Sequence, residues 1–411
     1  MSGKKIKVCF LHPWIKNIDD VLELLCIKDM PIAERFELDD EAPDYVIATD
    51  YVVSSYEHMK KFRNLVWRTS RNPVRIFWTE ECISPDFNIF DYTITWNWKL
   101  SYRDRAARIP PHIFIGHNMT EHVNTLSYED AINLLRQGKL RFCNFFYSNN
   151  GVSGKLKRDE LFYALSNYKH VDSLGRYLNN VGGIIVDDNK ITEPSQGLSR
   201  GGKYSWQDVS VRLKSNYKFT IAAENAQSDG YISEKLLLSF LAHSVPIYWG
   251  DPYVAEEYNP EAFINCNDYD NFDNVVKRVK EIDEDDELWA RMVSQSWQTE
   301  KQRHKSEAEY ESYKKFIMNI FTSPIEQAYR RTVGEWGYLY GLWYFEQNFT
   351  RKKRNLLQRI IRLMFRPKKL FGKLFAKLLF CIKGKLLLLF ILKLLLKLLG
   401  KLLPLKLLAK L

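Results

Sequence analysis

Short apolar runs alternate with amphipathic stretches along residues 6–282 of the chain. The apolar runs, each bounded by turn-forming residues, predict β-strands at residues 6–12, 44–50, 74–80, 91–96, 140–148, 217–225, 245–251 and 262–268. Stretches in which apolar residues recur every three or four positions predict helices at residues 19–30, 157–168, 231–243 and 271–282. Strands that alternate with helices are typical of parallel sheets covered on both faces, so we predict an α/β fold.

The strands fall into two series, which predict two doubly wound, Rossmann-like domains. We place the first domain at residues 1–140, the second at residues 141–325, a helical linker at residues 326–350 and a C-terminal tail at residues 351–411. The polar, glycine-rich residues 184–206 predict a loop, and residues 287–348 predict long helices packed across both domains. Because ligands bind beyond the carboxyl ends of parallel strands, two facing domains would form their ligand site in the cleft between them.

The tail repeats lysine and leucine with a helical spacing. Its lysines recur at steps of four, at Lys369, Lys373 and Lys377 and again at Lys393, Lys397 and Lys401. This spacing places the cations on one helical face, with leucine and phenylalanine opposite. The longest uncharged run, Leu386–Leu392, has seven residues, whereas a spanning helix needs about 20 apolar residues. We therefore expect an amphipathic tail that lies in a membrane interface. The alternative is a helix that packs on the protein's own acidic body or mediates oligomers.

Charge is distributed unevenly between the tail and the rest of the chain. Residues 351–411 hold 18 Lys and Arg and no acidic residue, which leaves residues 1–350 with a formal charge of −8. A nucleic-acid-binding enzyme spreads basic residues over its folded surface, so the pattern favours an anionic lipid surface as the partner and argues against nucleic acid. The start of the chain, MSGKKIKVCFLHPW, lacks the apolar region of a secretory signal, and the six cysteines are scattered. We expect a peripheral protein on the cytoplasmic side of a membrane.

The segment 217–251 is the most informative part of the sequence for chemistry. In it a strand ends in a polar loop, a helix begins, and a second strand ends in WGD. Tyr231, Glu234 and Lys235 have the spacing of one helical face. A helix N-terminus favours anions, so Lys235 is placed to meet a phosphate and Glu234 to bind a ribose. From spacing alone, a capped helix with a surface Glu–Lys pair is the better explanation.

Other patterns in the sequence give weaker evidence about the chemistry of the protein. Asp268, Tyr269 and Asp270 form a DxD string, but the string precedes a predicted helix, so we attribute it to helix capping and predict no metal ligands there. His243 lies at a predicted helix end, where it fits a C-terminal cap. The dinucleotide fingerprint GxGxxG is absent from the sequence.

Three blocks of the sequence resemble one family. The string ENAQSDGYISEKLLLSFLAHSVPIYWGDP resembles the donor-binding signature of the α-1,3-fucosyltransferases, glycosyltransferase family 10, and IYWGDP followed by NPEAFINCND resembles the bacterial branch. WTEECISPDFNIFDYTITW (78–96) is similar to the family's acidic segment, and RDELFYALSNYKHVDSLGRYLNNVGG (158–183) to its arginine helix. The blocks occur in the family's order and cover roughly residues 75–285.

The resemblance implies a GT-B-like fold and an inverting transfer of L-fucose from GDP-fucose. The acceptor would be a hydroxyl of N-acetylglucosamine in an N-acetyllactosamine-type glycan, with an α-1,3 linkage, as in Lewis-type or lipopolysaccharide glycans. No cofactor is implied, and a divalent cation such as Mn²⁺ would at most stimulate. The alternatives are a GT-B transferase for another nucleotide sugar and a non-catalytic glycan-binding protein on the same scaffold.

The resemblance also implies roles for individual residues. Glu81 matches the general base, although the adjacent Glu80 is a rival. Arg158 and Lys235 match the pair that grips the diphosphate, with Lys155 and Lys157 as basic neighbours of Arg158. Glu234 matches the ribose contact, and Asn225 and Tyr231 match positions of the donor pocket. An arginine suits a phosphate because its planar fork donates two hydrogen bonds at once.

Overall fold

The structure is a computed structural model. It describes residues 4–13, 15–67, 72–97, 99–100, 102–110, 112–113, 125–138, 140–148, 155–182, 184–186, 189–191, 206–332 and 334–347. The chain separates into two compact units, residues 1–345 and residues 346–411. The predicted amphipathic tail lies outside the described residues.

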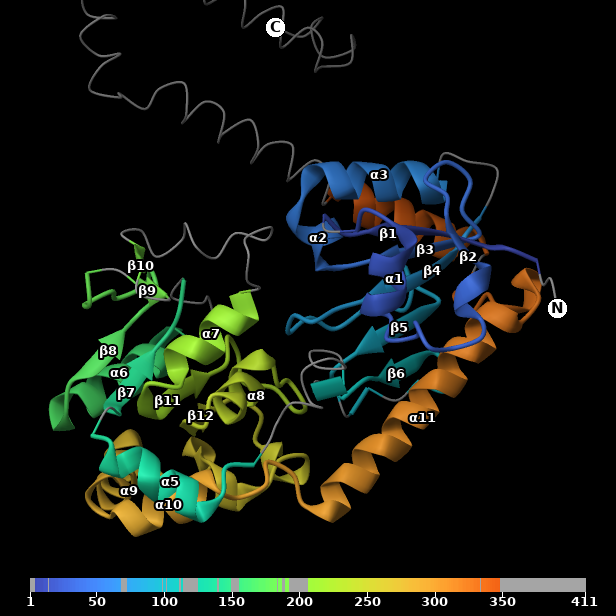
Figure 1. Cartoon of the computed structure of the whole chain (residues 1–411). Coiled ribbons are helices and arrows are strands. Elements are labelled where there is room, and N and C mark those ends of the chain that lie inside the picture. Colours follow the sequence, from blue (N-terminus) through green and yellow to red (C-terminus); the bar gives the residue numbers. More distant parts are fainter. Residues whose placement is uncertain are drawn as a thin grey trace, which may run out of the picture. The chain divides into compact units, whose positions relative to one another are not determined.

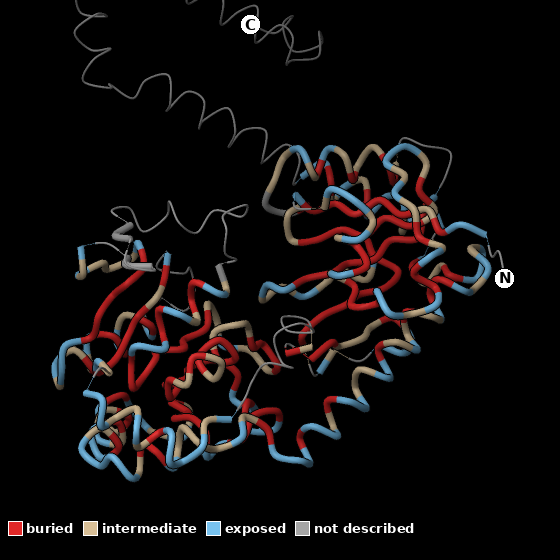
Figure 2. The backbone as a smooth tube through the Cα atoms, in the orientation of Figure 1, coloured by how far each residue is buried: buried red, intermediate tan, exposed pale blue. Residues whose placement is uncertain are grey.

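The first sheet has six parallel strands in the order β2-β1-β3-β4-β5-β6. They are β1 (Ile6–Leu11), β2 (Phe36–Leu38), β3 (Tyr45–Ala48), β4 (Val74–Trp78), β5 (Tyr92–Thr95) and β6 (Ala106–Arg108). Around this sheet the chain forms α1 (Ile18–Leu24), η1 (Ala33–Arg35), α2 (Asp50–Ser54) and α3 (Tyr56–Trp67). Every residue of β3, β4 and β5 is buried (Figure 2). Burial on both faces explains why these strands have continuous apolar runs in the sequence.

The second sheet has five parallel strands in the order β13-β12-β11-β7-β8 (Figure 1). They are β7 (Arg141–Phe145), β8 (Val171–Ser173), β11 (Tyr217–Ala223), β12 (Val245–Trp249) and β13 (Ile264–Asn265). The associated helices are α5 (Tyr128–Arg136), α6 (Lys155–Tyr168), α7 (Trp206–Lys214), α8 (Glu234–Leu241), α9 (Phe272–Glu284) and α10 (Asp286–Val293). Short 3-10 turns follow at η3 (Val254–Glu256), η4 (Pro260–Ala262) and η5 (Cys266–Asp268). The predicted α/β fold with two parallel sheets is confirmed.

Two local predictions differ from the structure. The predicted loop at 184–206 contains an antiparallel hairpin of β9 (Ile184–Val186) and β10 (Asn189–Ile191), while residues 192–205 lie outside the described part. The helix predicted at 19–30 ends at Leu24 because Cys26 adopts a left-handed backbone with φ of 51°. The amides of Cys26 and Ile27 then bond back to the carbonyls of Glu23 and Leu22, which closes the helix end.

Helix α11 (Glu300–Thr322), orange in Figure 1, contacts elements of both sheets. Near the start of α11, the side-chain amide of Gln302 donates to the carbonyl of Ala255 at 2.8 Å. Ala255 lies in η3, which follows β12 of the second sheet. Further along, Tyr313 donates to the carbonyl of Leu25 at 2.6 Å, and Ile317 lies in the core of the first sheet. The predicted long helix across both domains is therefore confirmed. After α11 come η6 (Ile325–Gln327) and a helix at residues 335–347.

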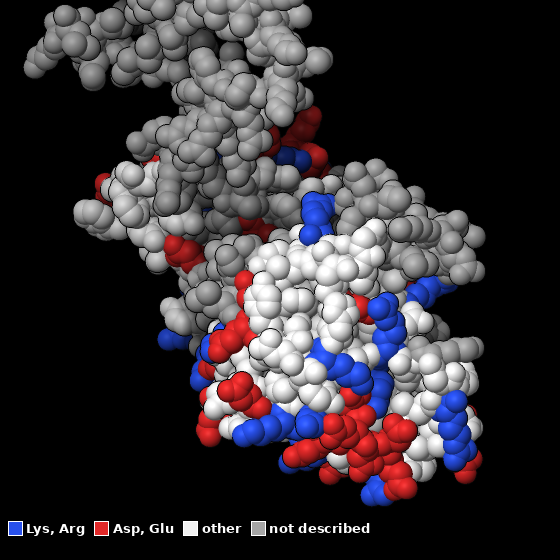
Figure 3. All heavy atoms as spheres, turned by 90° about the vertical axis from the view of Figure 1, so that its left-hand side faces the viewer, with Lys and Arg blue, Asp and Glu red and all other residues white. Residues whose placement is uncertain are grey.

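The face of the molecule in Figure 3 carries lysine and arginine interspersed with aspartate and glutamate, and acidic side chains gather at its lower end. This mixed surface fits the negative formal charge of residues 1–350. It is unlike the continuous basic field that a nucleic-acid-binding surface presents.

Candidate functional site

The loop between β11 and α8 folds differently from its helical pattern. Helix α8 begins at Glu234 with Ser233 as its N-cap, so the helix predicted from residue 231 starts three residues later. Gly230 has a φ of 84°, and the amide of Tyr231 bonds to the carbonyl of Ser228 in a turn. The expectation that Tyr231 shares a helical face with Glu234 and Lys235 is therefore wrong, because the turn holds Tyr231 outside the helix.

Tyr231 instead joins the loop after β11 to residues that follow strands of the first sheet. Its side chain is 2% exposed, and its ring meets Trp96 edge to face at 5.1 Å between centroids. Its hydroxyl donates to Oε2 of Glu81 at 3.4 Å. Asp229, in the same loop, pairs with Lys99. The loop after β11 is thus tied to the segments that follow β4 and β5 of the first sheet.

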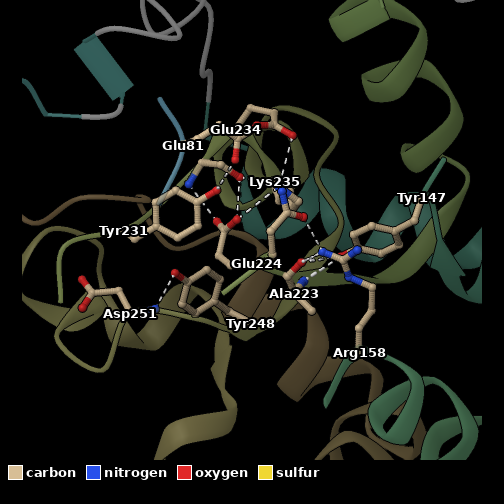
Figure 4. A network of polar contacts seen from close by, with 12 residues as sticks. Glu81, Tyr147, Arg158, Ala223, Glu224, Tyr231, Glu234, Lys235, Tyr248 and Asp251 are labelled. Carbon is tan, nitrogen blue, oxygen red and sulfur yellow. Dashed lines mark hydrogen bonds and ion pairs between the residues drawn. The ribbon is translucent and has the colours of Figure 1, made fainter. Parts of the chain in front are cut away.

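Lys235 lies in the first turn of α8, where the sequence places it (Figure 4). Its Nζ is 3.1 Å from Oε2 of Glu224, 2.6 Å from Oγ of Ser233 and 3.4 Å from Oε1 of Glu234. Burial disfavours the ammonium, but the carboxylates of Glu224 and then Glu234 outweigh it, so the pKa of Lys235 is raised. Burial likewise opposes the Glu234 carboxylate, yet Lys235 lowers the pKa of Glu234. Both groups are therefore held charged.

Glu224 is a site residue that the sequence analysis did not single out. It directly follows β11 and is fully buried, with its carboxylate accepting from the amide and hydroxyl of Ser233 at 2.7 and 2.6 Å. An ionisable residue is rarely fully buried unless it is paired. The signal in the sequence was a carboxylate at the end of an apolar strand, directly before the residue chosen as a candidate, Asn225.

Arg158 turns inward from α6 and is 1% exposed (Figure 4). Its guanidinium lies over the ring of Tyr147 at 4.0 Å and donates to the carbonyl of Ala223 at 3.1 Å and to Oδ1 of Asn225 at 2.8 Å. Lys157 pairs with Glu160 on the exposed side of the same helix, and the side chain of Lys155 lies outside the described part. The structure thus brings Arg158 and Asn225 together at the carboxyl end of β11. Tyr147, which stacks on the arginine, was missed because an aromatic at a strand end also fits a core position.

Glu80 and Glu81 follow β4, and both are exposed. The backbone of Glu81 is fixed, since its amide donates to Oγ1 of Thr79 at 3.0 Å and its carbonyl accepts from the indole N–H of Trp96 at 2.7 Å. The contact with Tyr231 turns the carboxylate of Glu81 toward the loop after β11. The negative charge of this carboxylate also acts on Asp50, which follows the neighbouring strand β3. Burial and then the charge of Glu81 raise the pKa of Asp50 to about 6.

The weaker patterns have structural explanations. Asn271 caps α9 by accepting from the amide of Asn274, while Asp268 accepts from Nδ2 of Asn265, so the cap falls one residue after the DxD string. His243 has a φ of 51° and donates its amide to the carbonyl of Phe240, which confirms its place at the helix end. In the part of the chain that the structure describes, no three His, Cys, Asp or Glu residues are grouped as metal ligands would be.

Two parallel α/β sheets, with cations and carboxylates gathered beyond the carboxyl ends of their strands, define the GT-B class of nucleotide-sugar transferase scaffolds. Comparison with known families gives the same answer. Residues 32–115 match the family described as "Alpha-(1,3)-fucosyltransferase FucT N-terminal domain", and residues 136–322 match "Glycosyltransferase family 10 (fucosyltransferase) C-term". The chain belongs to glycosyltransferase family 10.

Similar proteins include the alpha-(1,3)-fucosyltransferase FucT of Helicobacter pylori, 29% identical over 57% of this chain and 52% of that protein. A putative fucosyltransferase of Acanthamoeba polyphaga mimivirus is 30% identical over 51% of this chain and 32% of that protein. The chain thus spans about half or less of the length of these relatives. A crystal structure of an α1,3-fucosyltransferase superposes with a TM-score of 0.54 at 21% identity, covering 76% of this chain and 90% of that chain. The likeness at this identity shows the fold.

Proposed function

We propose that the protein transfers L-fucose from GDP-fucose to a hydroxyl of N-acetylglucosamine in an N-acetyllactosamine-type glycan, with an α-1,3 linkage and inversion at the transferred carbon. Membership of glycosyltransferase family 10 supports the proposal. The observation that carries it is the convergence of Arg158, Lys235 and Glu81 on the loop after β11. Lewis-type glycans and lipopolysaccharide chains offer such acceptors.

In the proposed reaction Glu81 takes the proton of the acceptor hydroxyl. The acceptor oxygen attacks the anomeric carbon of fucose from the face opposite GDP. The bond between that carbon and the diphosphate oxygen breaks with its electron pair, and GDP leaves. Arg158 and Lys235 stabilise the charge that develops on the diphosphate, which is the main electrostatic demand of such a step.

The remaining candidates bind the donor in this proposal. Glu234 accepts from a ribose hydroxyl, because its carboxylate is held charged at the start of α8 beside Lys235. Asn225 positions Arg158 through its side-chain oxygen. Tyr231 links the donor loop to Glu81. The pocket would therefore couple donor binding to the orientation of the base.

Mass-spectrometric detection of fucose added to N-acetyllactosamine tests the reaction, and Glu80→Gln is the matched control for Glu81→Gln. We expect product from the wild type and from Glu80→Gln, and loss of at least about a hundredfold in rate with Glu81→Gln. GDP affinity should be unchanged in both variants. Loss of activity in Glu80→Gln alone would transfer the role of base to Glu80.

Donor competition separates GDP-fucose from other nucleotide sugars. GDP-mannose and UDP-sugars should neither donate nor displace GDP-fucose more effectively than GDP does. Linkage analysis of the product should give the 1,3 position. GDP binding without transfer to any glycan would instead support a non-catalytic glycan-binding protein.

We further propose that the protein acts at the cytoplasmic side of an anionic membrane, through residues 351–411. The basic Lys/Leu pattern supports this. A second support is the helix at residues 335–347, where Phe345 is buried against Phe62 and Trp67. On this helix Trp336, Tyr340 and Trp343 are 83%, 37% and 58% exposed, and such aromatics favour the lipid headgroup region. Of the helices the structure describes, none has the length and apolar character to span a bilayer.

A further inference from the structure

Glu224 joins three elements around the first turn of α8. It follows β11, its amide donates to the carbonyl of Trp249 in β12 at 2.8 Å, and its carboxylate holds the amide and hydroxyl of Ser233. Ser233 is the N-cap of α8, yet within the described residues 233–241 its side chain makes no capping bond to the helix. The hydroxyl is committed to Glu224 instead. The direction in which α8 starts is therefore set by a carboxylate from the neighbouring strand.

The surrounding residues leave the carboxylate of Glu224 little freedom. A Cβ at Gly250 would lie 2.6 Å from Cγ of Glu224 and 2.5 Å from the hydroxyl of Tyr248, so the glycine of WGD is needed for the close approach of the two strand ends. Figure 4 shows Glu224 between Tyr231, Tyr248 and Lys235, with its oxygens directed at the start of α8. Packing on all sides fixes both the position and the direction of this carboxylate.

Lys235 is the cation that Glu224 contacts. The ammonium lies 3.1 Å from Oε2 of Glu224, and the side chain of Lys235 is 15% exposed, so one side of the cation meets Glu224 while the side chain keeps some access to solvent. A buried lysine without a partner tends to lose its proton. Burial does oppose the ammonium here, but the carboxylates of Glu224 and then Glu234 together outweigh burial, so the pKa of Lys235 is raised.

We propose that Glu224 is a positioning residue for the diphosphate: its carboxylate keeps Lys235 charged and aims the ammonium at the leaving group of the donor. Glu224 itself does not touch the donor, and it acts through Lys235 and through the Ser233 cap. The inference rests on the proposed function, in which Lys235 binds the diphosphate.

Calorimetric titration with GDP at several pH values tests the positioning role of Glu224. The affinities of the wild type, Glu224→Gln, Lys235→Gln and the double variant are compared as a double-mutant cycle. Lys235→Gln should weaken GDP binding roughly tenfold to a hundredfold, and Glu224→Gln roughly tenfold, because a charge-assisted hydrogen bond is lost or misdirected. The double variant should bind GDP like Lys235→Gln alone, since residues that act as one unit are not additive. In Glu224→Gln, GDP affinity should also begin to fall at a lower alkaline pH than in the wild type. Glu256→Gln, an exposed glutamate paired with Lys305, is the matched control and should change nothing.

The outcomes separate this inference from the proposed function. If Lys235→Gln leaves GDP affinity unchanged, the diphosphate assignment fails whatever Glu224 does. If Lys235→Gln weakens binding but the effect of Glu224→Gln multiplies with it, or if Glu224→Gln tightens binding because the carboxylate merely repels the diphosphate, the positioning role is overturned. Should Glu224→Gln fail to fold by circular dichroism, Glu224→Asp takes its place: it keeps the charge but shortens the reach. GDP affinity equal to that of the wild type in Glu224→Asp would also overturn the aiming role.

Discussion

Gly250 shows at the residue scale how a site can depend on a missing side chain. A Cβ there would approach Cγ of Glu224 to 2.6 Å. We expect Gly250→Ala to destabilise the protein by about 1–3 kcal/mol, as overpacking of a core does, and to weaken GDP binding by displacing Glu224. Chemical denaturation and GDP titration measure the two effects. Gly334→Ala is the control, because among the described residues, its chain neighbours aside, no atom lies within 4 Å of a Cβ at that position, and an equal loss in both variants would contradict the role of Gly250.

Lys214, the last residue of α7, is 5% exposed and interacts electrostatically with Glu234 and Lys235. Burial lowers the pKa of Lys214 to about 7, against the attraction of Glu234. The folded state then binds fewer protons than the unfolded chain between about pH 7 and pH 10, so stability rises with pH across this window and is lost as pH falls toward 7. Lys214→Met should therefore stabilise the protein most at and below pH 7 and little near pH 10. Urea denaturation over that pH range tests this, and a gain that is the same at every pH would refute it.

The proposed catalytic step uses side-chain cations where other transferases use a metal ion. Arg158, on α6, and Lys235, on α8, both lie beside the end of β11. Asn225 holds Arg158, and Glu224 holds Lys235. We expect transfer to continue in EDTA and Mn²⁺ to raise the rate at most severalfold. Loss of activity in EDTA, restored by Mn²⁺, would show that these two cations do not suffice.

Sequence patterns supplied most of the candidate site residues but did not show how their side chains are held. Lys235 and Arg158 could be proposed from the sequence because their motifs occur in the family's order. Glu224 was not, because nothing in a single sequence shows that a carboxylate after a strand is fully buried and bonded to Ser233. Such a role depends on how the ends of β11 and β12 pack against the start of α8, which spacing in the sequence does not reveal.

At the scale of elements, the long buried strands were predictable, whereas most strands of three residues or fewer were not, β13 being an exception. Strand β11 has seven buried residues, five of them apolar, whereas β2, β6 and β8 have three residues each, too few to show a period. The start of α8 was misplaced because Tyr231 fits the helical spacing. In the structure Tyr231 lies in the turn formed at Gly230, which has a left-handed backbone, and the helix begins only at Glu234. Turn geometry overrode periodicity at that point.

The segment after η6 is fastened to the first sheet by Asp91, which precedes β5. This fully buried carboxylate accepts the amides of Arg330 at 2.8 Å, Arg331 at 2.9 Å and Arg75 at 2.9 Å, and pairs with the guanidinium of Arg331. Asp91→Asn should lower the free energy of unfolding by about 3 kcal/mol, because it leaves a buried cation without its charge partner. Thermal denaturation measures this, with Asp104→Asn, which removes a more exposed partner of Arg330, as the control. Equal effects would mean that burial of the pair does not matter.

At the scale of the whole molecule, the charge divides the chain into an acidic region and a basic tail. Truncation after Thr350 removes 18 cations and leaves a formal charge of −8. We expect the truncated protein to keep the proposed fucosyl transfer to soluble acceptors and to lose co-sedimentation with vesicles that contain anionic lipid. Binding of the full chain should weaken as salt is added. A truncated protein that still sediments with these vesicles would assign lipid binding to the exposed aromatic helix instead of the tail.

Helix α11 has a consequence for how the protein is made. The core of the sheet built from residues 6–108 includes Tyr313, Ile317, Ile320 and Phe321, which the ribosome adds about two hundred residues after the last strand of that sheet. During synthesis the first sheet therefore waits with an uncovered apolar face until α11 has emerged, and such faces are prone to aggregate or to recruit chaperones. The early part of the chain depends for its completion on a helix that is translated about two hundred residues later.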